Sequence, residues 1–254
     1  MLRDALPNIE QAQAWAADRA ASDERAAALC NDWPLAGAHL WPLQQPAHVR
    51  IRWLETAILA SEQLDDRHAK ANHLANMSLS FAELGDLDQA IAVAEEGLRI
   101  ARSVGEEITE LGLLGNLGSA HADRGDWAAA EESFKQAFTL AQRLGSRRSM
   151  GQTLNSLGLL HFERGELAEA ATLLNEAVAI ARDIGDRKLE GNALGNLGIL
   201  ADSSNEPARA ITFHEERLVI ARELGDERGE SRALGNLGNA CLDLGVGTAR
   251  RSPR

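Results

Sequence analysis

Tyrosine is absent from the 254-residue sequence, and aromatic residues together make up only 4% of it. Because strands favour β-branched and aromatic residues, a core built from Leu, Ile and Ala indicates packed helices rather than a sheet sandwich. The two cysteines, Cys30 and Cys241, lie far apart and fit neither a disulfide framework nor a metal site. The sequence shows no basic-then-apolar leader and no apolar run approaching about 18 residues, so a cytoplasmic protein is expected.

Positive charge is also scarce. The formal net charge of -12 argues against a duplex nucleic-acid surface, which needs a basic stripe. No Gly-x-x-x-x-Gly-Lys-Ser/Thr loop occurs, and no Ser, Cys or carboxylate constellation has the spacing of a nucleophile and its base. We therefore expect a protein that is not an enzyme and that uses no cofactor.

What the sequence does contain is an internal repeat of 40 residues. The segment Leu113–Gly118 reads LLGNLG, and it returns as ALGNLG at 193–198 and 233–238. A worn copy, TLNSLG, occupies 153–158, and HLANMS occupies 73–78. A fixed period of this size indicates a stacked array of helical repeats.

Each repeat is predicted to be a helix, a tight turn and a second helix. In one copy, Leu114, Leu117 and His121 share a face of a first helix over 107–124. Gly125 supplies the left-handed residue that ends this helix, and Asp126 caps the next one. The same pair of a helix-ending residue and a capping residue recurs along the chain.

Glycines also occur inside the first helices, where Gly costs about 1 kcal/mol relative to Ala. Their cost predicts close contact with the second helix of the pair, which carries Ala130, Ala170 and Ala210 opposite them. These glycines are Gly118, Gly158, Gly198 and Gly238.

Leu117-Gly118, the ring at His121, Ala130 and Phe134 match the tetratricopeptide repeat pattern in order and spacing. The chain resembles the 40-residue subclass with the Leu-Gly-Asn signature, over about residues 67–245. The resemblance implies an all-α fold, a right-handed superhelical solenoid of antiparallel helix pairs.

The expected organisation is a diverged helical N-terminal segment, four repeats, a terminal half-repeat helix and a basic disordered tail. Their bounds are 1–66, 67–105, 107–145, 147–185, 187–225, 227–245 and 246–254. The N-terminal segment is rich in Trp and Pro, with its own aromatic packing and a last helix in repeat register. Through Leu6–Glu10 and Arg52–Ile58 it resembles the helical region behind the nucleotide switch of bacterial NB-ARC (STAND-type) regulators, in which the repeat array is the sensor. The ATPase of those regulators is missing here.

The resemblance places the first helix of each repeat on the inner wall, where a partner would bind. An Asn amide can pair with any peptide backbone, and a Gly beside it leaves room for the ligand chain. The candidates are Asn76, Asn116, Ser156, Asn196, Asn236, Gly115, Asn155, Gly195 and Gly235. In the alternative interpretation, the Asn residues bond neighbouring helices and the Gly residues set curvature. The first interpretation predicts that Asn116→Ala with Asn196→Ala weakens binding and leaves the melting temperature almost unchanged.

Two further positions recur near the ends of the first helices. Asp123 and Glu163 make the groove acidic if they face it, favouring a basic or neutral peptide, or they are solvated helix ends. His121 and His161 replace a core aromatic residue and are expected to pack, since zinc would need further ligands nearby.

No second helix is expected after 227–245, which leaves Leu234, Leu237 and Cys241 without their usual cover. A lone cap, a truncated gene product and a dimerising face are three interpretations, and the last predicts oligomerisation through this helix.

The expected function is a scaffold for protein–protein interaction in bacterial signalling or regulation. It would bind an extended peptide or a helix of a partner in its concave groove, and neither nucleic acid nor membrane. One alternative is a ligand- or peptide-sensing regulatory array. Another is an accessory array of an enzyme whose catalytic domain is on another chain.

Overall fold

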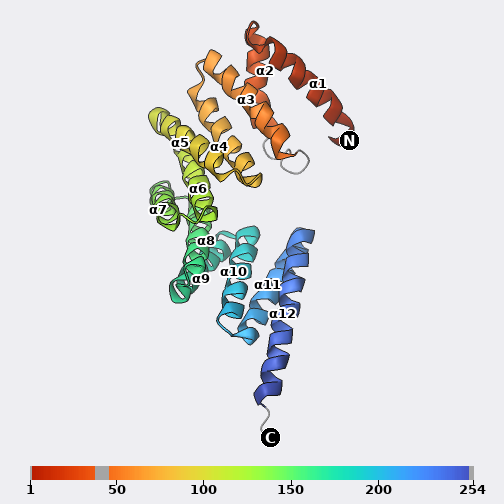
Figure 1. Ribbon diagram of the computed structural model, residues 1–254, viewed down its shortest axis with the longest axis vertical. Coiled ribbons are helices and arrows are strands. Elements are labelled where there is room, and N and C mark those ends of the chain that lie inside the picture. The colour runs from red at the N-terminus through yellow and green to blue at the C-terminus, as the bar shows by residue number, and fades with distance from the viewer. Residues whose placement is uncertain (1, 38–45, 252–254) are drawn as a thin grey trace. The chain divides into compact units, whose positions relative to one another are not determined.

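The structure is a computed structural model that describes residues 2–37 and 46–251, and every regular element in these ranges is an α-helix (Figure 1). The predicted all-α helical-repeat architecture is confirmed. In order, the helices are α1 (Leu2–Ala20), α2 (Glu24–Gly37), α3 (Ala47–Gln63), α4 (Arg67–Glu83), α5 (Leu87–Val104), α6 (Glu107–Asp123), α7 (Trp127–Arg143), α8 (Arg147–Glu163), α9 (Leu167–Ile184), α10 (Arg187–Ser203), α11 (Pro207–Leu224) and α12 (Glu227–Arg251).

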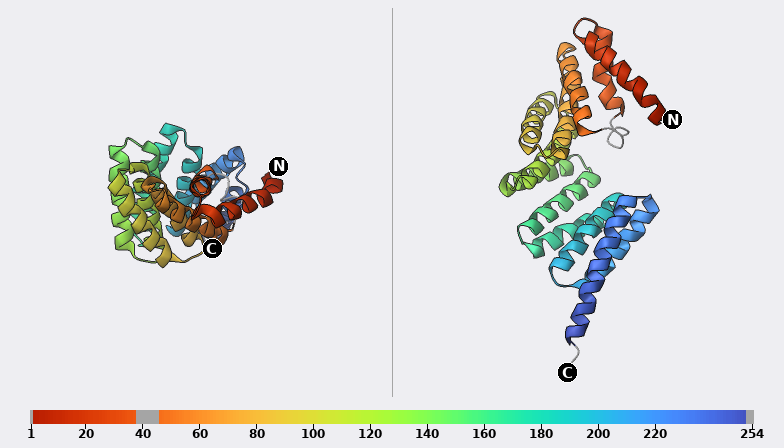
Figure 2. Two further views of the ribbon diagram at one scale, coloured as in Figure 1. Left: turned by 90° about the horizontal axis from the view of Figure 1, so that it is seen from above. Right: turned by 45° about the vertical axis from the view of Figure 1, so that its right-hand side comes forward.

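The chain forms two compact units, Met1–Ser133 and Phe134–Arg254, whose boundary lies inside α7. Within a unit, helices adjacent in sequence pack on each other, for example α4 with α5 and α10 with α11. Turns of three residues reverse the chain between them, so the two helices of a pair run antiparallel (Figure 2). We call α4, α6, α8, α10 and α12 the A helices, and α5, α7, α9 and α11 the B helices.

Left-handed residues end the helices every 20 residues, as predicted. The series is Asp65, Gly85, Gly105, Gly125, Gly145, Gly165, Gly185, Asn205 and Gly225. At several turns an aspartate then caps the next helix: the Asp86 carboxylate accepts the Gln89 N–H at 3.2 Å. Asp65 extends the same series to the end of α3, which places the last helix of the N-terminal segment in register with the repeats.

The glycines inside the A helices make room for B-helix side chains, as predicted for two of them. A Cβ at Gly158 would lie 2.7 Å from Cγ of Leu174, and one at Gly198 would lie 2.6 Å from Nδ1 of His214. Both distances are well below van der Waals contact. At Gly238 the prediction is wrong, because no atom lies within 4 Å of the place that a Cβ would occupy and no B helix follows α12 in the described part of the chain.

The last helix is longer than expected. α12 continues through Gly245 to Arg251, so the segment 246–251 is helical rather than a disordered tail, and 252–254 lie outside the described residues. Gly245 does not adopt a positive φ, unlike Gly85 or Gly165 at the same repeat position. The acidic residue that follows those glycines, which caps the next helix at Asp86, is replaced here by Val246, so no side-chain acceptor starts a new helix.

The N-terminal helices pack mainly through small side chains. The buried cluster consists of Ala16, Ala27, Cys30 and Ala60. Trp53 is buried, whereas Trp15 is half exposed with the guanidinium of Arg19 at 5.0 Å from its ring centroid. Trp41 lies outside the described residues. The aromatic packing expected for this segment is therefore limited to Trp53 among the side chains that the structure describes.

Candidate partner-binding surface

At two positions, the recurring asparagine joins its A helix to the A helix before it. In α6, Nδ2 of Asn116 donates to the carbonyl oxygen of Ala75 at 3.0 Å and to Oγ of Ser78 at 2.9 Å. In α10, Nδ2 of Asn196 donates to Oδ1 of Asn155 at 2.9 Å. Because one repeat is 40 residues long, each amide meets the residue 41 positions earlier, on the neighbouring A helix.

These bonds are the ones that the alternative interpretation predicts. Asn116 uses both N–H groups of its amide within the fold, and both Asn116 and Asn196 stay half-buried. Their Oδ1 atoms have no hydrogen-bond donor among the described residues. Asn76, Asn236 and Ser156 are half-buried too, and the structure shows no side-chain hydrogen bond for them in its described part. The column therefore builds the fold at two positions, and a ligand-binding role for its remaining acceptor atoms stays a prediction.

The glycines beside the column differ from one another. Gly115 and Gly235 have nothing within 4 Å of an added Cβ, so both leave open space. Gly195 does not. Arg217 of α11 lies over it, with Cδ 2.9 Å from the position of a Cβ, and Gly195 is buried. The expectation that Gly195 leaves room for a ligand is wrong, because a long side chain of the same repeat fills that room.

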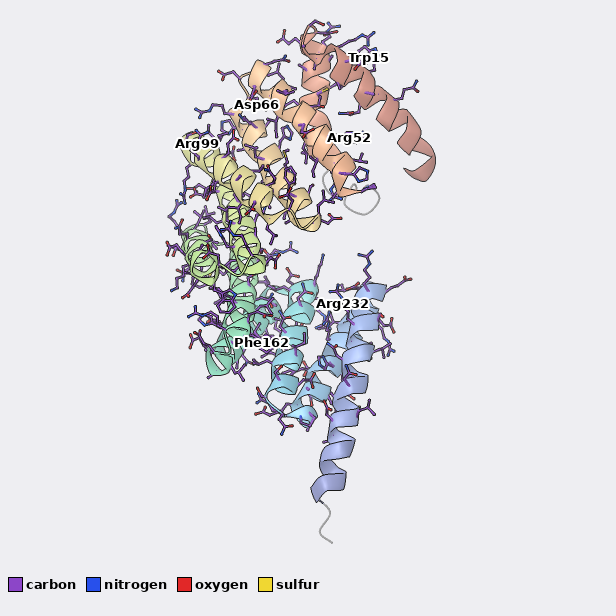
Figure 3. The ribbon with its side chains drawn as sticks, in the orientation of Figure 1. Trp15, Arg52, Asp66, Arg99, Phe162 and Arg232 are labelled. Atoms are coloured by element: carbon purple, nitrogen blue, oxygen red, sulfur yellow. The ribbon has the colours of Figure 1, made fainter. Side chains whose placement is uncertain are left out.

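Arg217 is half-buried, and the charge of a second arginine, Arg232, acts on it. Burial lowers the pKa of its guanidinium, the charge of Arg232 on α12 lowers it further, and Asp226 acts in the opposite direction. Arg232 lies near the start of α12 (Figure 3). Neither Arg217 nor Arg232 forms an ion pair with a described residue. Other arginines of the unit are paired with glutamates, namely Arg182, Arg187 and Arg222. Two like charges that form no ion pair favour an anionic group of a ligand at this place.

The acidic candidates lie at exposed helix ends. Asp123 and Glu163 are both exposed at the last residues of α6 and α8. Glu83, at the same repeat position, forms an ion pair with Arg50 of α3. Exposure of this kind agrees with solvated helix ends, and steering of a basic peptide by these residues stays a prediction.

A row of exposed apolar side chains, which sequence reasoning missed, lies three residues after the asparagine column. Leu79, Leu159 and Ile199 are 53%, 41% and 37% exposed, whereas Leu157 and Leu197 on the other side of their helices are buried. The sequence signal was an apolar residue at three of the five copies of one repeat position outside the buried stripe, with Ser119 and Asn239 at the other two. We call the exposed side of α8 and α10, which carries Leu159, Ile199 and Asn196 within the second unit, the A face.

The two candidate histidines pack against turns. Their side chains are 12% and 15% exposed, with Nδ1 of His121 3.8 Å from the Asp126 carboxylate and Nδ1 of His161 2.5 Å from that of Glu166. Each pair joins the end of an A helix to the start of the following B helix. In the described part of the chain, no group of three or more His, Cys, Asp or Glu side chains is placed to hold a metal ion.

Comparison with known families agrees with this geometry. The family model described as tetratricopeptide repeat matches residues 109–183 and 149–223. A model of anaphase-promoting complex subunit 5 matches residues 65–113. Residues 109–223 therefore consist of tetratricopeptide repeats. No curated protein matches its sequence.

Three solved structures illustrate the likeness. Aspartyl phosphate phosphatase F from Bacillus subtilis is 17% identical, with a TM-score of 0.73 over 97% of this chain and 63% of that chain. A Signal Transduction ATPase with Numerous Domains (STAND) protein with a tetratricopeptide repeat sensor, from Pyrococcus horikoshii, is 15% identical, with a TM-score of 0.65 over 85% and 34%. A Rap protein complexed with Competence and Sporulation Factor is 15% identical, with a TM-score of 0.53 over 79% and 60%.

At these identities the likeness shows the fold alone. This chain spans 63%, 34% and 60% of the three chains, so each of them contains parts with no counterpart here. None of the described helices combines the length and the apolar character that crossing a membrane requires.

Proposed function

We propose that the A face binds an extended segment of a partner protein, in a bacterial signalling or regulatory setting. The tetratricopeptide repeats make the chain a protein-interaction scaffold. The observation that carries the proposal is the exposed apolar pair Leu159 and Ile199, on two A helices of the second unit whose opposite side is buried. An apolar pair beside a half-buried amide offers a peptide both hydrophobic contact and a hydrogen-bond acceptor.

The second unit suggests the chemistry of that segment. Leu159 and Ile199 would contact apolar side chains, and Oδ1 of Asn196 would accept a backbone N–H. Arg217 and Arg232 would pair with a carboxylate, because neither forms an ion pair with a described residue. We therefore expect the segment bound by this unit to be apolar and to carry an acidic residue. This differs from the basic peptide that Asp123 and Glu163 would favour.

A sensing role is the second candidate. Two proteins with the same fold favour it: the STAND protein, whose repeats are described as a sensor, and the Rap protein, which carries a bound factor. In a sensor, the occupant of the A face is a signal rather than a stable partner. Scaffold and sensor share the same binding surface and differ in the consequence of binding.

Affinity capture with three baits tests the proposal. The wild-type chain is compared with the double variant Leu159→Ser/Ile199→Ser and with Val219→Ser, a control on the B helix α11 at 53% exposure. Loss of two apolar contacts should reduce partner recovery by roughly 10- to 100-fold, while the control recovers as much as wild type. All three baits should unfold at similar urea concentrations, because the changed side chains are exposed. Equal recovery by the double variant and wild type would exclude the A face as the binding surface.

A further inference from the structure

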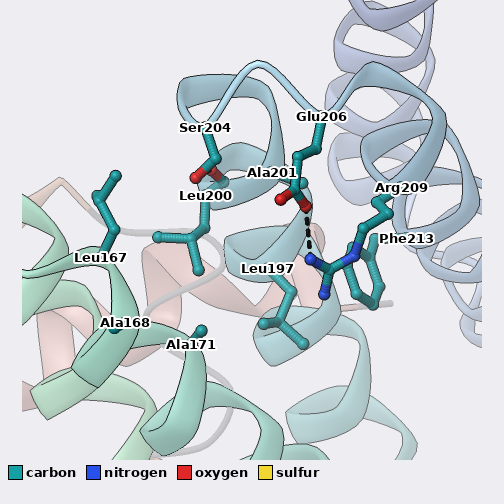
Figure 4. A pocket seen from close by; sticks show the side chains of 10 residues that line it. All are labelled: Leu167, Ala168, Ala171, Leu197, Leu200, Ala201, Ser204, Glu206, Arg209 and Phe213. Carbon is teal, nitrogen blue, oxygen red and sulfur yellow. Dashed lines mark hydrogen bonds and ion pairs between the residues drawn. The ribbon is translucent and has the colours of Figure 1, made fainter.

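One pocket of the second unit lies where the repeat lacks a ring. It has a volume of about 220 Å³ and lies between the start of α9, the end of α10 and the start of α11 (Figure 4). Leu197, Leu200 and Phe213 give it apolar walls, and Glu206 and Arg209 stand beside them. Binding pockets for drug-sized molecules measure about 300–1,000 Å³, so this one suits a single side chain.

The other repeats explain why the pocket exists. Ala201 of α10 lines the pocket, and the residue at the same repeat position has a ring in the three preceding repeats. Those residues are Phe81, His121 and His161. Both histidine rings are largely buried, whereas Ala201 offers only a methyl group. Phe213 packs beside Ala201, and part of the space that a ring fills elsewhere is left open as the pocket.

The carboxylate beside the pocket also lacks the partner that its counterpart has in the preceding repeat. In the third repeat Nδ1 of His161 lies 2.5 Å from Oε2 of Glu166. Glu206 is the counterpart of Glu166, but it has no histidine to pair with. Its Oε2 is held by Nη1 of Arg209 at 2.5 Å, and Oε1 has no donor among the described residues. The side chains of Glu206 and Arg209 are 43% and 62% exposed, so this side of the pocket is open to solvent.

We propose that the Ala201 pocket binds the imidazole ring of a histidine from the partner segment, with a ring N–H donating to Glu206. Leu197, Leu200 and Phe213 would contact the ring, and the guanidinium carbon of Arg209 lies 5.9 Å from the Phe213 ring centroid. The carboxylate selects a ring with an N–H, since an apolar ring would cover Glu206 without giving it a donor. The proposed function supplies only the source of the ring, because the pocket itself can be tested with a small molecule.

The test is a titration of the whole chain with 4-methylimidazole, followed by amide shifts of Leu197 and Phe213 in nuclear magnetic resonance spectra. Saturable shifts with a Kd on the order of millimolar are expected for so small a ligand. Ala201→His should abolish them, because it places in the pocket the ring that two other repeats carry there. Glu206→Gln should weaken binding by roughly tenfold while keeping the shape of the pocket. Toluene, a ring of similar size without an N–H, should bind more weakly than 4-methylimidazole.

Three outcomes would overturn the proposal: no saturable shift in the wild type, equal shifts in Ala201→His, or toluene binding as tightly as 4-methylimidazole. Partner capture through Leu159 and Ile199 is measured separately. A failed titration would therefore leave the proposed function standing, and a failed capture would leave the pocket assignment standing. When both succeed, Ala201→His should also lower the affinity for the captured partner.

Discussion

The Nε2 atom of His73 lies 3.1 Å from Oδ1 of Asn31, and this hydrogen bond joins α4 to α2. Nδ2 of Asn31 donates in turn to Asp66 at 3.1 Å, and the same carboxylate accepts the backbone N–H of Ala69 at 2.9 Å. Because Oδ1 of Asn31 can only accept a hydrogen bond, Nε2 of His73 carries the proton. Nδ1 of His73 is buried without a partner among the described residues. A second proton would therefore meet no acceptor. The neutral imidazole of His73 therefore links the N-terminal segment to the first repeat by a hydrogen bond.

Acid should weaken this link. Burial lowers the pKa of His73 to about 4, with Asp66 and Asn31 opposing it less strongly. Between the unfolded pKa of about 6.5 and the folded value, the unfolded chain binds a proton that the folded chain does not. The free energy of unfolding should therefore fall as the pH drops from about 6.5 towards 4, by up to about 3 kcal/mol. Urea midpoints measured across this range check it. His73→Met should flatten the profile, and an unchanged profile would place the acid sensitivity in another group.

Glycines at one repeat position should respond oppositely to alanine. Gly198→Ala would drive a methyl group into the buried ring of His214, and such overpacking typically costs about 1–3 kcal/mol. Gly238→Ala meets open space inside α12 and should stabilise the chain by up to about 1 kcal/mol. Urea unfolding of the two variants measures both effects. His214→Ala should recover part of the loss in Gly198→Ala, because it removes the side chain that the new methyl group meets. Equal effects of alanine at both glycines would contradict this explanation.

Local chemistry explains which parts of the fold were predictable. Gly85 and Asp86 fix a helix end and a helix start through one left-handed residue and one side-chain acceptor, so a single sequence shows both boundaries. At 245 the glycine is present but the acidic cap is not, and the helix continues. A glycine alone was therefore a weaker signal than the Gly-Asp pair.

The surface was less predictable because it depends on side chains from other helices. Periodicity placed Gly195 correctly on an A helix, but could not show that Arg217 reaches over it from the B helix. It also identified Asn116 without deciding between a ligand and the neighbouring helix, since the amide suits both. The apolar residue at 159 was visible in the sequence, but its exposure depends on which side of the helix its neighbours cover.

The observed hydrogen bonds revise the expectation for the asparagine column. Asn116→Ala would remove the inter-helix donor of the Ala75 carbonyl and of Ser78 Oγ, and Asn196→Ala would leave Oδ1 of Asn155 without its donor. Each change should cost about 1 kcal/mol, so the melting temperature of the double variant should fall rather than stay constant. Asn76→Ala is the matched control at the same repeat position, with no side-chain bond in the described residues, and should be nearly neutral. Calorimetry of the double variant and the control decides this. An unshifted melting temperature in the double variant would mean that the inter-helix bonds contribute no net stability.

A buried carboxylate should matter more than its exposed counterpart. The side chain of Glu190 is 6% exposed. Its carboxylate accepts hydrogen bonds from Nε of Arg182 at 2.7 Å and from Nη1 of Arg187 at 2.5 Å. Burial alone would raise its pKa, but the two guanidinium groups outweigh burial and the pKa is lowered. Its contribution to stability is therefore present above the unfolded pKa of about 4.5 and is lost as the pH falls below that value. Glu230 pairs with Arg222 at 2.8 Å in the next repeat, with side chains 35% and 57% exposed.

Glutamine at these two positions separates burial from pairing. Glu190→Gln should cost about 2 kcal/mol, less than a fully buried pair because both arginines reach solvent. Glu230→Gln should cost less than about 1 kcal/mol, and screening by about 0.5 M salt should remove most of that smaller effect. Urea unfolding at about pH 7 in low and high salt measures both costs. The cost at Glu190 should persist in salt, because its carboxylate is shielded from the solvent ions. Equal costs that vanish together in salt would show that the network at Glu190 acts only as a surface ion pair.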